Sequence, residues 1–251
     1  MTEGYKMKTA WLLAFCLPVL AFSQIMRIHQ SDGSTHDYSI AEIDSITFAS
    51  HYGALTWIGH ASVKIKTNDG IVIYIDPYAG NDYKEAADII LVSHGHSDHN
   101  QVNKVTQKAN CRIFSGPSAS VGGTKMTPGD SVEVDGISIK AVDAYNSNHP
   151  KGSGVGFIIA FAGVKIYHSG DTGKIDEMAA LTALNLNYAM LCIDGVYNMN
   201  AQDAAAVAQT LPTAKAIPIH IAPSNASAAE KQRNIDKFNP PNKLILKEGE
   251  T

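Results

Sequence analysis

The chain is poor in cysteine, in tryptophan and in charge. Its 251 residues include 3 Cys and 2 Trp, and only 18% are charged. Three cysteines are too few for a disulfide framework, and 45% hydrophobic residues exclude a disordered, collagen-like or coiled-coil protein. The net charge of −4 provides no basic surface, so no nucleic-acid partner is expected. What remains is a globular protein with a sizeable core.

The sequence also lacks a hydrophobic run long enough to span a bilayer, which takes about 20 residues. A shorter apolar run from Ala10 to Phe22 follows two lysines and ends in Ala21-Phe22-Ser23. This pattern is typical of a secretory signal peptide. We therefore expect residues 1–23 to be removed, the protein to be periplasmic or extracellular, and no stable membrane span. In such a compartment Cys111 and Cys192 could pair, although two unpaired thiols are the preferred interpretation.

The rest of the chain divides into a short segment and a large one. Residues 24–53 are predicted to form a β-rich module with strands at 25–28 and 44–48. Residues 54–251 begin with short strands and tight turns, including a continuous apolar strand at 89–93 that should be buried on both faces. The last third alternates helix and strand. Helices are expected at 174–184, 201–210 and 225–237, with Asn200 and Ser224 as N-caps, and strands at 188–193, 215–219 and 243–247. This order predicts two packed sheets with helices outside.

The segment that follows the apolar strand carries the chemistry. It reads Ser93-His94-Gly95-His96-Ser97-Asp98-His99-Asn100, a His-x-His-x-Asp-His pattern. Neutral imidazole and carboxylate groups are ligands for zinc and similar divalent ions. Close spacing on a loop at a strand end allows such side chains to converge. The alternative, a polar loop with incidental histidines, is disfavoured because clustered imidazoles without metal repel one another when protonated.

This pattern resembles the signature of the metallo-β-lactamase superfamily. The resemblance implies an α+β or α/β fold, a four-layer αββα sandwich over residues 54–251, with the metal site at one edge of its sheets. It also implies three further ligands downstream, in the order histidine, aspartate, histidine. His149, Asp171 in Gly170-Asp171-Thr172, and His220 occupy those places.

The resemblance further assigns the ligands to two ions. The first ion would take His94, His96 and His149, the second would take Asp98, His99 and His220, and Asp171 would bridge them. Two divalent ions are expected as cofactors, zinc in the first instance, with manganese or iron as alternatives.

Two other histidines need separate interpretation. Strand periodicity places Tyr167, Ser169 and Asp171 on one face and His168 on the other, so His168 is expected to be structural or to support the ligands. Three segments resemble the lactonase-like group, which includes ascorbate-6-phosphate lactonase and, more distantly, N-acyl phosphatidylethanolamine phospholipase D. These segments are Thr56–Ser62, Ile75-Asp76-Pro77 and Tyr167–Thr172. His60, in the first of them, is either close to the site or a hydrogen-bonded turn residue.

The expected function is an exported binuclear metal-dependent hydrolase acting on a small molecule. A metal-bridging hydroxide would cleave an ester, lactone or phosphodiester bond, and Asp98 would be the catalytic residue that orients the water or accepts its proton. Two alternatives remain. One is a true β-lactamase, and the other is a non-catalytic metal-binding protein or a mononuclear iron oxidoreductase on the same fold.

Overall fold

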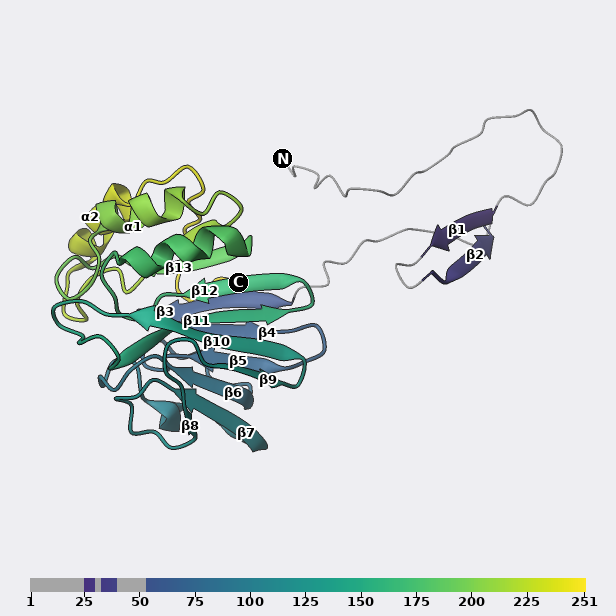
Figure 1. The fold of residues 1–251 in the computed structure, drawn as a ribbon, viewed down its shortest axis with the longest axis horizontal. Coiled ribbons are helices and arrows are strands. Elements are labelled where there is room, and N and C mark those ends of the chain that lie inside the picture. The colour runs from purple at the N-terminus through teal and green to yellow at the C-terminus, as the bar shows by residue number, and fades with distance from the viewer. Residues whose placement is uncertain (1–24, 30–32, 40–52) are drawn as a thin grey trace. The chain divides into compact units, whose positions relative to one another are not determined.

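A computed structural model of the chain describes residues 25–29, 33–39 and 53–251 (Figure 1). The chain divides into two units, residues 1–49 and 50–251. In the first unit, β1 (Ile25–His29) pairs antiparallel with β2 (Thr35–Ser39), and Arg27 Nε lies 2.6 Å from Asp37 Oδ1. The predicted signal peptide and the predicted strand at 44–48 lie outside the described residues. Within the described ranges, no helix is long and apolar enough to cross a membrane.

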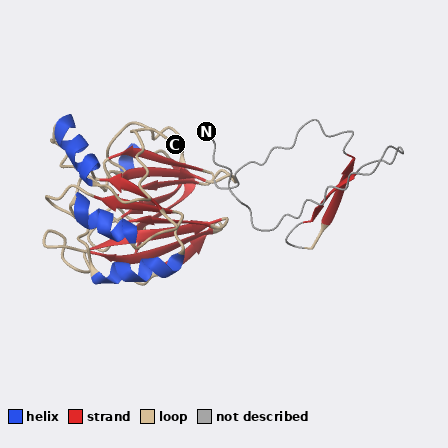
Figure 2. Ribbon diagram, turned by 90° about the horizontal axis from the view of Figure 1, so that it is seen from above, coloured by secondary structure: helices blue, strands red, loops and turns tan. Residues whose placement is uncertain are grey.

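The second unit is built on two six-stranded mixed sheets (Figures 1 and 2). The first has the order β3-β4-β5-β6-β7-β8, with bounds Ala54–Gly59, Ser62–Lys66, Val72–Ile75, Ala87–Val92, Gln107–Ser115 and Thr124–Lys125. The second has the order β14-β13-β12-β11-β10-β9, with bounds Lys215–Ile219, Tyr188–Cys192, Val164–His168, Gly154–Phe161, Ile137–Ala144 and Ser131–Val134. The main helices are α1 (Ala201–Gln209), α2 (Ala228–Lys237) and the 3₁₀ helices η2 (Val102–Lys104) and η3 (Asp176–Leu184).

Alternation along the strands produces the main core between the sheets. On β4 and β5 the inward side chains are Val63, Ile65, Ile73 and Ile75, and on the facing sheet every second residue of β10 and β11 is inward. Phe157 in the middle of β11 is fully buried there. The two sheets are therefore fixed face to face by apolar side chains of period two.

The outer faces are covered differently. Helices α1, α2 and η3 pack on the outer face of the second sheet, where Tyr167 and Leu191 lie in the same cluster as Val207 and Phe238. The outer face of the first sheet is covered by loops and the single turn of η2. Ile90 lies in that outer cluster and Leu91 in the main core, so β6 is buried on both faces as predicted. The expected sandwich fold is confirmed, although the helical layer over the first sheet is reduced to η2.

Three predicted elements differ in detail. The helix at 174–184 is a 3₁₀ helix whose buried residues, Met178 and Leu181, are three positions apart, which matches a three-residue turn. Helix α2 begins at Ala228 because Ser227, and not Ser224, is its N-cap and forms a capping box with Glu230.

The third difference concerns the predicted strand at 243–247, which is not a strand. A single bridge joins Lys243 to Ala216 of β14, and the chain then leaves that sheet. It reaches the first sheet at β3, where the amide of Gly249 donates to Trp57 O at 2.8 Å. The segment crosses from one sheet to the other, so it cannot keep a ladder with either.

The two ends of the sandwich have different roles. The ends of β6, β12 and β14 lead into the loops that carry the predicted ligands. At the opposite end, the tight turns 67–70, 135–136 and 162–163 lie together and line one shallow groove. The predicted chemistry is therefore confined to one end of the unit.

Candidate metal centre

The seven predicted ligands converge at one end of the two sheets. His94 to His99 follow β6, His149 lies between β10 and β11, and Asp171 and His220 follow β12 and β14. Three groups have ligand atoms within 4.8 Å of one another: His94, His96 and His149; His94, His99 and Asp171; and His60, Asp98, His99 and His220. The predicted residues of each ion thus lie together, and His60 joins the second set.

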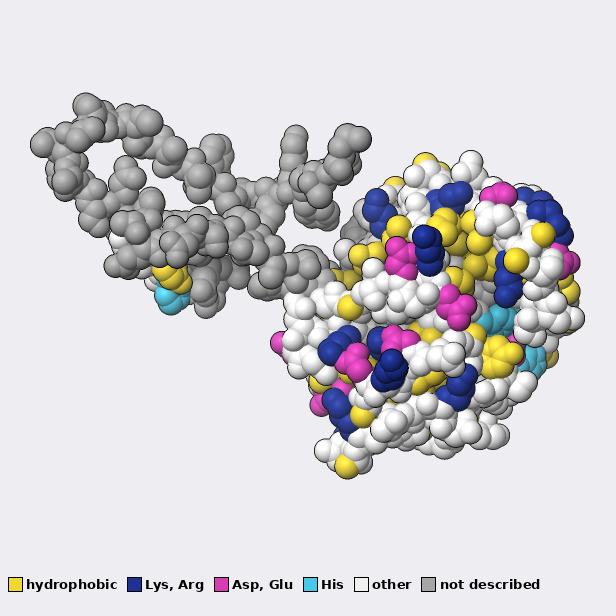
Figure 3. Space-filling model, turned by 180° about the vertical axis from the view of Figure 1, so that it is seen from behind, with side chains coloured by type: hydrophobic (Ala, Val, Ile, Leu, Met, Phe, Trp, Pro, Cys, Tyr) yellow, Lys and Arg dark blue, Asp and Glu magenta, His cyan; other side chains and the backbone are white. Residues whose placement is uncertain are grey.

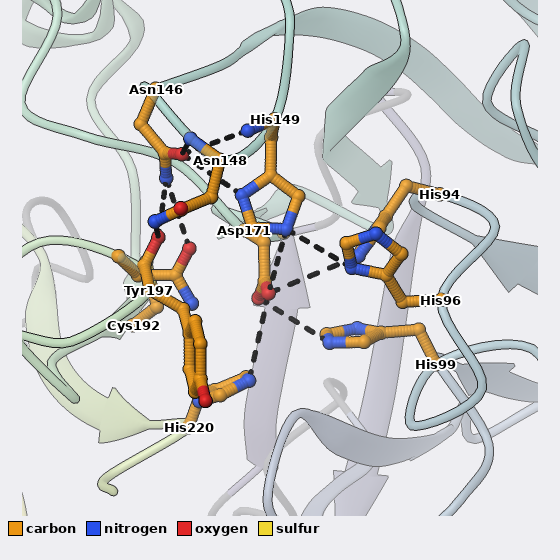
Figure 4. A network of polar contacts seen from close by, with 12 residues as sticks. His94, His96, His99, Asn146, Asn148, His149, Asp171, Cys192, Tyr197 and His220 are labelled. Carbon is orange, nitrogen blue, oxygen red and sulfur yellow. Dashed lines mark hydrogen bonds and ion pairs between the residues drawn. The ribbon is translucent and has the colours of Figure 1, made fainter. Parts of the chain in front are cut away.

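Asp171 lies at the centre of this cluster (Figure 4). Its Oδ2 is 3.4 Å from His149 Nε2, 3.5 Å from His220 Nε2 and 3.9 Å from His94 Nε2. Its Oδ1 is 3.4 Å from His99 Nε2. One carboxylate therefore contacts histidines of both predicted sets, as a bridging ligand must.

In four of the predicted ligand histidines, ring nitrogen Nδ1 contacts a second residue. The contacts are Ser93 Oγ to His94 Nδ1 (3.0 Å), Asp76 Oδ2 to His99 Nδ1 (2.8 Å), Asn146 Oδ1 to His149 Nδ1 (3.0 Å) and Asp194 Oδ2 to His220 Nδ1 (3.3 Å). Such contacts fix ring orientation and tautomer, and leave Nε2 free to act as a ligand. Four of the five predicted ligand histidines thus have a supporting residue, and His96 Nδ1 instead contacts His149 Nε2 at 3.2 Å.

Several buried polar atoms of the cluster have no hydrogen-bond partner among the described residues. They include His94 Nε2, His99 Nε2 and Asp171 Oδ1. A fourth is His220 Nδ1, which lies 3.3 Å from Asp194 Oδ2 as an ion-pair contact without hydrogen-bond geometry. An unpaired buried polar group costs free energy of about 1–3 kcal/mol, and here three of them face the same space. Divalent cations satisfy imidazole nitrogen and carboxylate oxygen together, so the residues present fit a metal site.

The histidines and carboxylates of the cluster shift one another's pKa values. Burial raises the pKa of the Asp171 carboxyl, but the imidazoles of His99 and His220 outweigh burial and hold that pKa well below its usual range. Burial, reinforced by the neighbouring His99, lowers the pKa of His94 to about 3. Burial lowers the pKa of His220, but Asp171 and Asp194 raise it to about 9. Positive charge is therefore favoured beside Asp171, and a bound cation would replace the proton there.

Asp76 is a functional residue that the ligand motif alone does not reveal. It is fully buried, accepts from Ser93 N and Ser93 Oγ at 2.6 Å each, and holds His99. It thus supports the first and last histidines of the motif, His99 directly and His94 through Ser93. Its signal in the sequence was a polar residue between the apolar strand 71–75 and Pro77. Asn146 and Asp194 had no comparable signal, because their role depends on loops that meet only in the fold.

His60 and His168 have different environments. His60 Nε2 is 3.1 Å from Asp98 Oδ2, and its ring centroid is 3.7 Å from that of His220. His168 is completely buried and is in none of the candidate metal groups formed by the described residues. Its Nε2 contacts Ala61 O at 2.9 Å, so it ties β12 to the first sheet. His60 therefore belongs to the site, while His168 has the structural role expected for it.

The cluster opens into a cleft of about 500 Å³. His96 is exposed, and histidine side chains reach the surface on the face shown in Figure 3. Uncharged side chains from the loops after β5, β6, β10, β13 and β14 complete the lining. A small molecule can thus approach the ligand atoms from solvent.

Comparison with known proteins agrees with this arrangement. A sequence model of the Beta-lactamase superfamily domain matches residues 54–220, a span that contains all seven predicted ligands. UPF0173 metal-dependent hydrolases from Hyperthermus butylicus and Thermoplasma volcanium are 30% and 32% identical over 228 and 186 residues. These matches cover 79% and 66% of this chain, and 98% and 82% of the two relatives.

Solved structures show the same fold. A protein assigned as a metal-dependent hydrolase from Parabacteroides distasonis aligns with a TM-score of 0.65 at 24% identity, over 90% of this chain and 99% of that chain. The metallo hydrolase Igni18 from Ignicoccus hospitalis aligns with a TM-score of 0.61 at 24% identity, over 78% of this chain and 95% of its own. By its family match, its relatives and its fold, the chain belongs to the metallo-β-lactamase superfamily.

Proposed function

We propose that this protein is a metal-dependent hydrolase that binds two divalent ions beside Asp171. The observation that carries the proposal is the set of buried, unpartnered ligand atoms around that carboxylate. One ion would be held by His94, His96 and His149, the other by Asp98, His99 and His220, with Asp171 in contact with both. The relatives named above are themselves called metal-dependent hydrolases. Zinc suits a mixed nitrogen and oxygen ligand set, and manganese or iron are alternatives.

Bound ions of this kind supply Lewis acidity and lower the pKa of a coordinated water toward neutrality. The chain supplies the rest of the machinery. The supported histidines keep their Nε2 atoms aimed at one small volume, so no reorganisation is needed when a substrate arrives. Asp171, buried and anionic, sets the negative charge that draws cations into this volume.

Asp98 is the carboxylate best placed to contact the attacking water. Its side chain is 32% exposed, while that of Asp171 is 4% exposed, so Asp98 faces the cleft. Its Oδ2 is 3.1 Å from His60 Nε2 and 3.7 Å from His220 Nε2. In this role Asp98 accepts a hydrogen bond from the attacking water and orients it, and His60 keeps the carboxylate in position. Burial raises the pKa of the Asp98 carboxyl, but the contacts with His220 and His60 hold that pKa well below its usual range, so the carboxylate stays anionic.

The bond cleaved is proposed to be an ester, lactone or phosphodiester of a small molecule. Support comes from the resemblance of Thr56–Ser62 and Tyr167–Thr172 to the lactonase-like group. The same segments disfavour a true β-lactamase. Three ligands for a second ion disfavour a mononuclear iron oxidoreductase, because a single ion does not need them. Export to the periplasm or the cell exterior is proposed from the signal-like segment 1–23.

The test is metal content, measured by elemental analysis of the chain purified without chelator. We expect about two ions per chain for the wild type, and less than about one for Asp171→Asn, which keeps the shape of the side chain and removes its charge. His36→Gln alters an exposed histidine of the β1–β2 pair and should leave metal content unchanged. The loaded protein is then assayed with lactones, aryl esters, phosphodiesters and a chromogenic cephalosporin.

Each alternative has its own signature in this experiment. One iron per chain would favour the oxidoreductase, and rapid turnover of the cephalosporin would favour a β-lactamase. Absence of metal even after reconstitution would overturn the proposal and leave a non-catalytic role.

A further inference from the structure

The loop between β13 and α1 presents two exposed hydrophobic side chains, one of which lines the cleft of the candidate metal centre. Val196 is 60% exposed and Tyr197 is 50% exposed, and Tyr197 lines the cleft together with Asp98 and His220. Large exposed hydrophobics are few in the described part of the chain, the others being Tyr38 and Ile245. An aromatic side chain left in solvent at the edge of a cleft is a typical contact for a bound ligand.

The backbone of this loop is held firmly although its side chains are exposed. Asp194 Oδ1 accepts from the amides of Val196 at 2.8 Å and Tyr197 at 2.7 Å. On the other side, Tyr197 O accepts from Asn146 Nδ2 at 2.9 Å and from Asn148 Nδ2 at 3.1 Å (Figure 4). The ring of Tyr197 is thus attached to a fixed point of the backbone.

The residues that hold this loop also support ligands of both predicted ions. Asp194 Oδ2 contacts His220 Nδ1, and Asn146 Oδ1 contacts His149 Nδ1. The position of Tyr197 relative to the ligand atoms is therefore set by two shared side chains. Such preorganisation reduces the entropy lost when a ligand binds between them.

Outside the cluster of predicted ligands, the described lining of the cleft offers no positive side chain to a substrate. Among the described residues that line it, none is lysine or arginine. Two lysines near its loops are engaged elsewhere: Lys104 Nζ donates to Tyr78 O and Gly80 O, and Lys151 Nζ lies 2.5 Å from Glu177 Oε1. An anionic substituent away from the ligand cluster would lose water without gaining a cation, which is costly.

We propose that the substrate is an uncharged ester or lactone that carries an apolar ring, and that Tyr197 is the specificity-determining residue that packs against that ring. The inference rests on the proposed hydrolase function, since the reacting bond must lie at the cluster of ligand atoms. It separates this protein from enzymes that act on phosphorylated lactones, because the phosphate group would meet no lysine or arginine among the described residues that line this cleft.

The test compares three γ-butyrolactones with the metal-loaded full chain: benzyl-substituted, unsubstituted and phosphomethyl-substituted. We expect kcat/KM to be highest for the benzyl compound. In Tyr197→Ala the ratio of kcat/KM for benzyl over unsubstituted lactone should fall about tenfold, mainly through KM, and Tyr197→Phe should restore most of it. The matched control is Tyr38→Ala, because Tyr38 belongs to the other unit and is 46% exposed. This variant should keep the ratio.

A binding measurement keeps the inference separate from turnover. 2-Benzylcyclopentanone has the shape of the benzyl lactone and no bond to hydrolyse, and calorimetry should show about tenfold weaker binding to Tyr197→Ala than to wild type. Faster turnover of the phosphomethyl lactone, or equal binding of the ketone by both proteins, would overturn the inference while leaving a hydrolase in place. Tyr197-dependent ketone binding without turnover of any lactone, aryl ester or phosphodiester would support the role of Tyr197 and contradict the proposed function.

Discussion

The amide of His220 donates a hydrogen bond to the carbonyl of His60 at 2.8 Å, and both residues have positive φ, 41° and 51°. His60 lies in the turn between β3 and β4 of the first sheet, and His220 directly follows β14 of the second. The second predicted ligand set therefore depends on a contact between the two sheets. Non-glycine residues rarely adopt positive φ, and strained residues of this kind cluster at functional sites.

Substitution of His60 should separate the effect of its ring from that of its backbone. Both His60→Gly and His60→Ala remove the contact with Asp98, so kcat should fall by about tenfold or more in each. Because glycine adopts positive φ without strain, the glycine variant should be more stable than the alanine variant by about 1 kcal/mol. Urea unfolding and steady-state kinetics measure the two effects. Equal stability of the variants would mean that the backbone at His60 is not strained.

Asp76→Asn should weaken metal binding, although Asp76 is buried behind the ligands and does not line the cleft. The carboxylate accepts from Ser93 N, Ser93 Oγ and His99 Nδ1, and an amide cannot accept all of these bonds. We expect metal affinity to fall by about 10- to 100-fold and the free energy of unfolding to fall by about 2–3 kcal/mol. Competition with a fluorescent chelator and urea unfolding measure these changes. Asp69→Asn, in the exposed turn at the opposite end, is the control.

Asp98→Ala should abolish turnover and leave the protein folded. The side chain is partly exposed at the cleft, so its removal creates no buried cavity. We expect less than about a tenth of wild-type kcat with an unchanged near-ultraviolet circular dichroism spectrum. A variant that retains more than this fraction would show that Asp98 is not needed to orient the attacking water, whatever its role in metal binding.

Removal of metal should destabilise the protein. A ligand that binds only the folded state adds stability in proportion to the logarithm of its concentration over Kd. With a chelator, His94 Nε2 and His99 Nε2 remain buried without partners, and Tm should fall by about 5 °C or more. Excess zinc should restore it. Asp171→Asn, which should hold fewer ions, should show a clearly smaller chelator-dependent shift, and a shift as large as that of the wild type would contradict the role of Asp171.

The two cysteines of the described region should remain thiols and differ in reactivity. Cys192 is buried on β13, where burial raises its pKa to about 12, while Cys111 on β7 is partly exposed with a pKa raised less. A raised pKa reduces the reactive thiolate at pH 8. Iodoacetamide followed by mass spectrometry should label Cys111 slowly and Cys192 only after unfolding. Labelling of Cys192 in the folded chain would indicate that β13 opens locally.

The order of strands and helices and the ligand loop could be predicted because both depend on local signals. Alternating apolar residues defined the strands, and the histidine motif is contiguous. The segment 243–247 was misjudged because its apolar residues resemble a strand, while its path is decided by two sheet edges distant in sequence. The supports Asn146 and Asp194 were missed for a related reason. Nothing near them in sequence indicates that their loops meet at Tyr197.

The turns at the far end of the sandwich have a practical consequence. The turn at Asp135-Gly136 is exposed and lies in the groove with the turns at 67–70 and 162–163, away from every ligand loop. Exposed tight turns are the positions where inserted sequence is best tolerated. A reporter domain or an immobilisation tag inserted between Asp135 and Gly136 should therefore leave the cleft open, so that the protein can be fixed to a surface while substrates are screened.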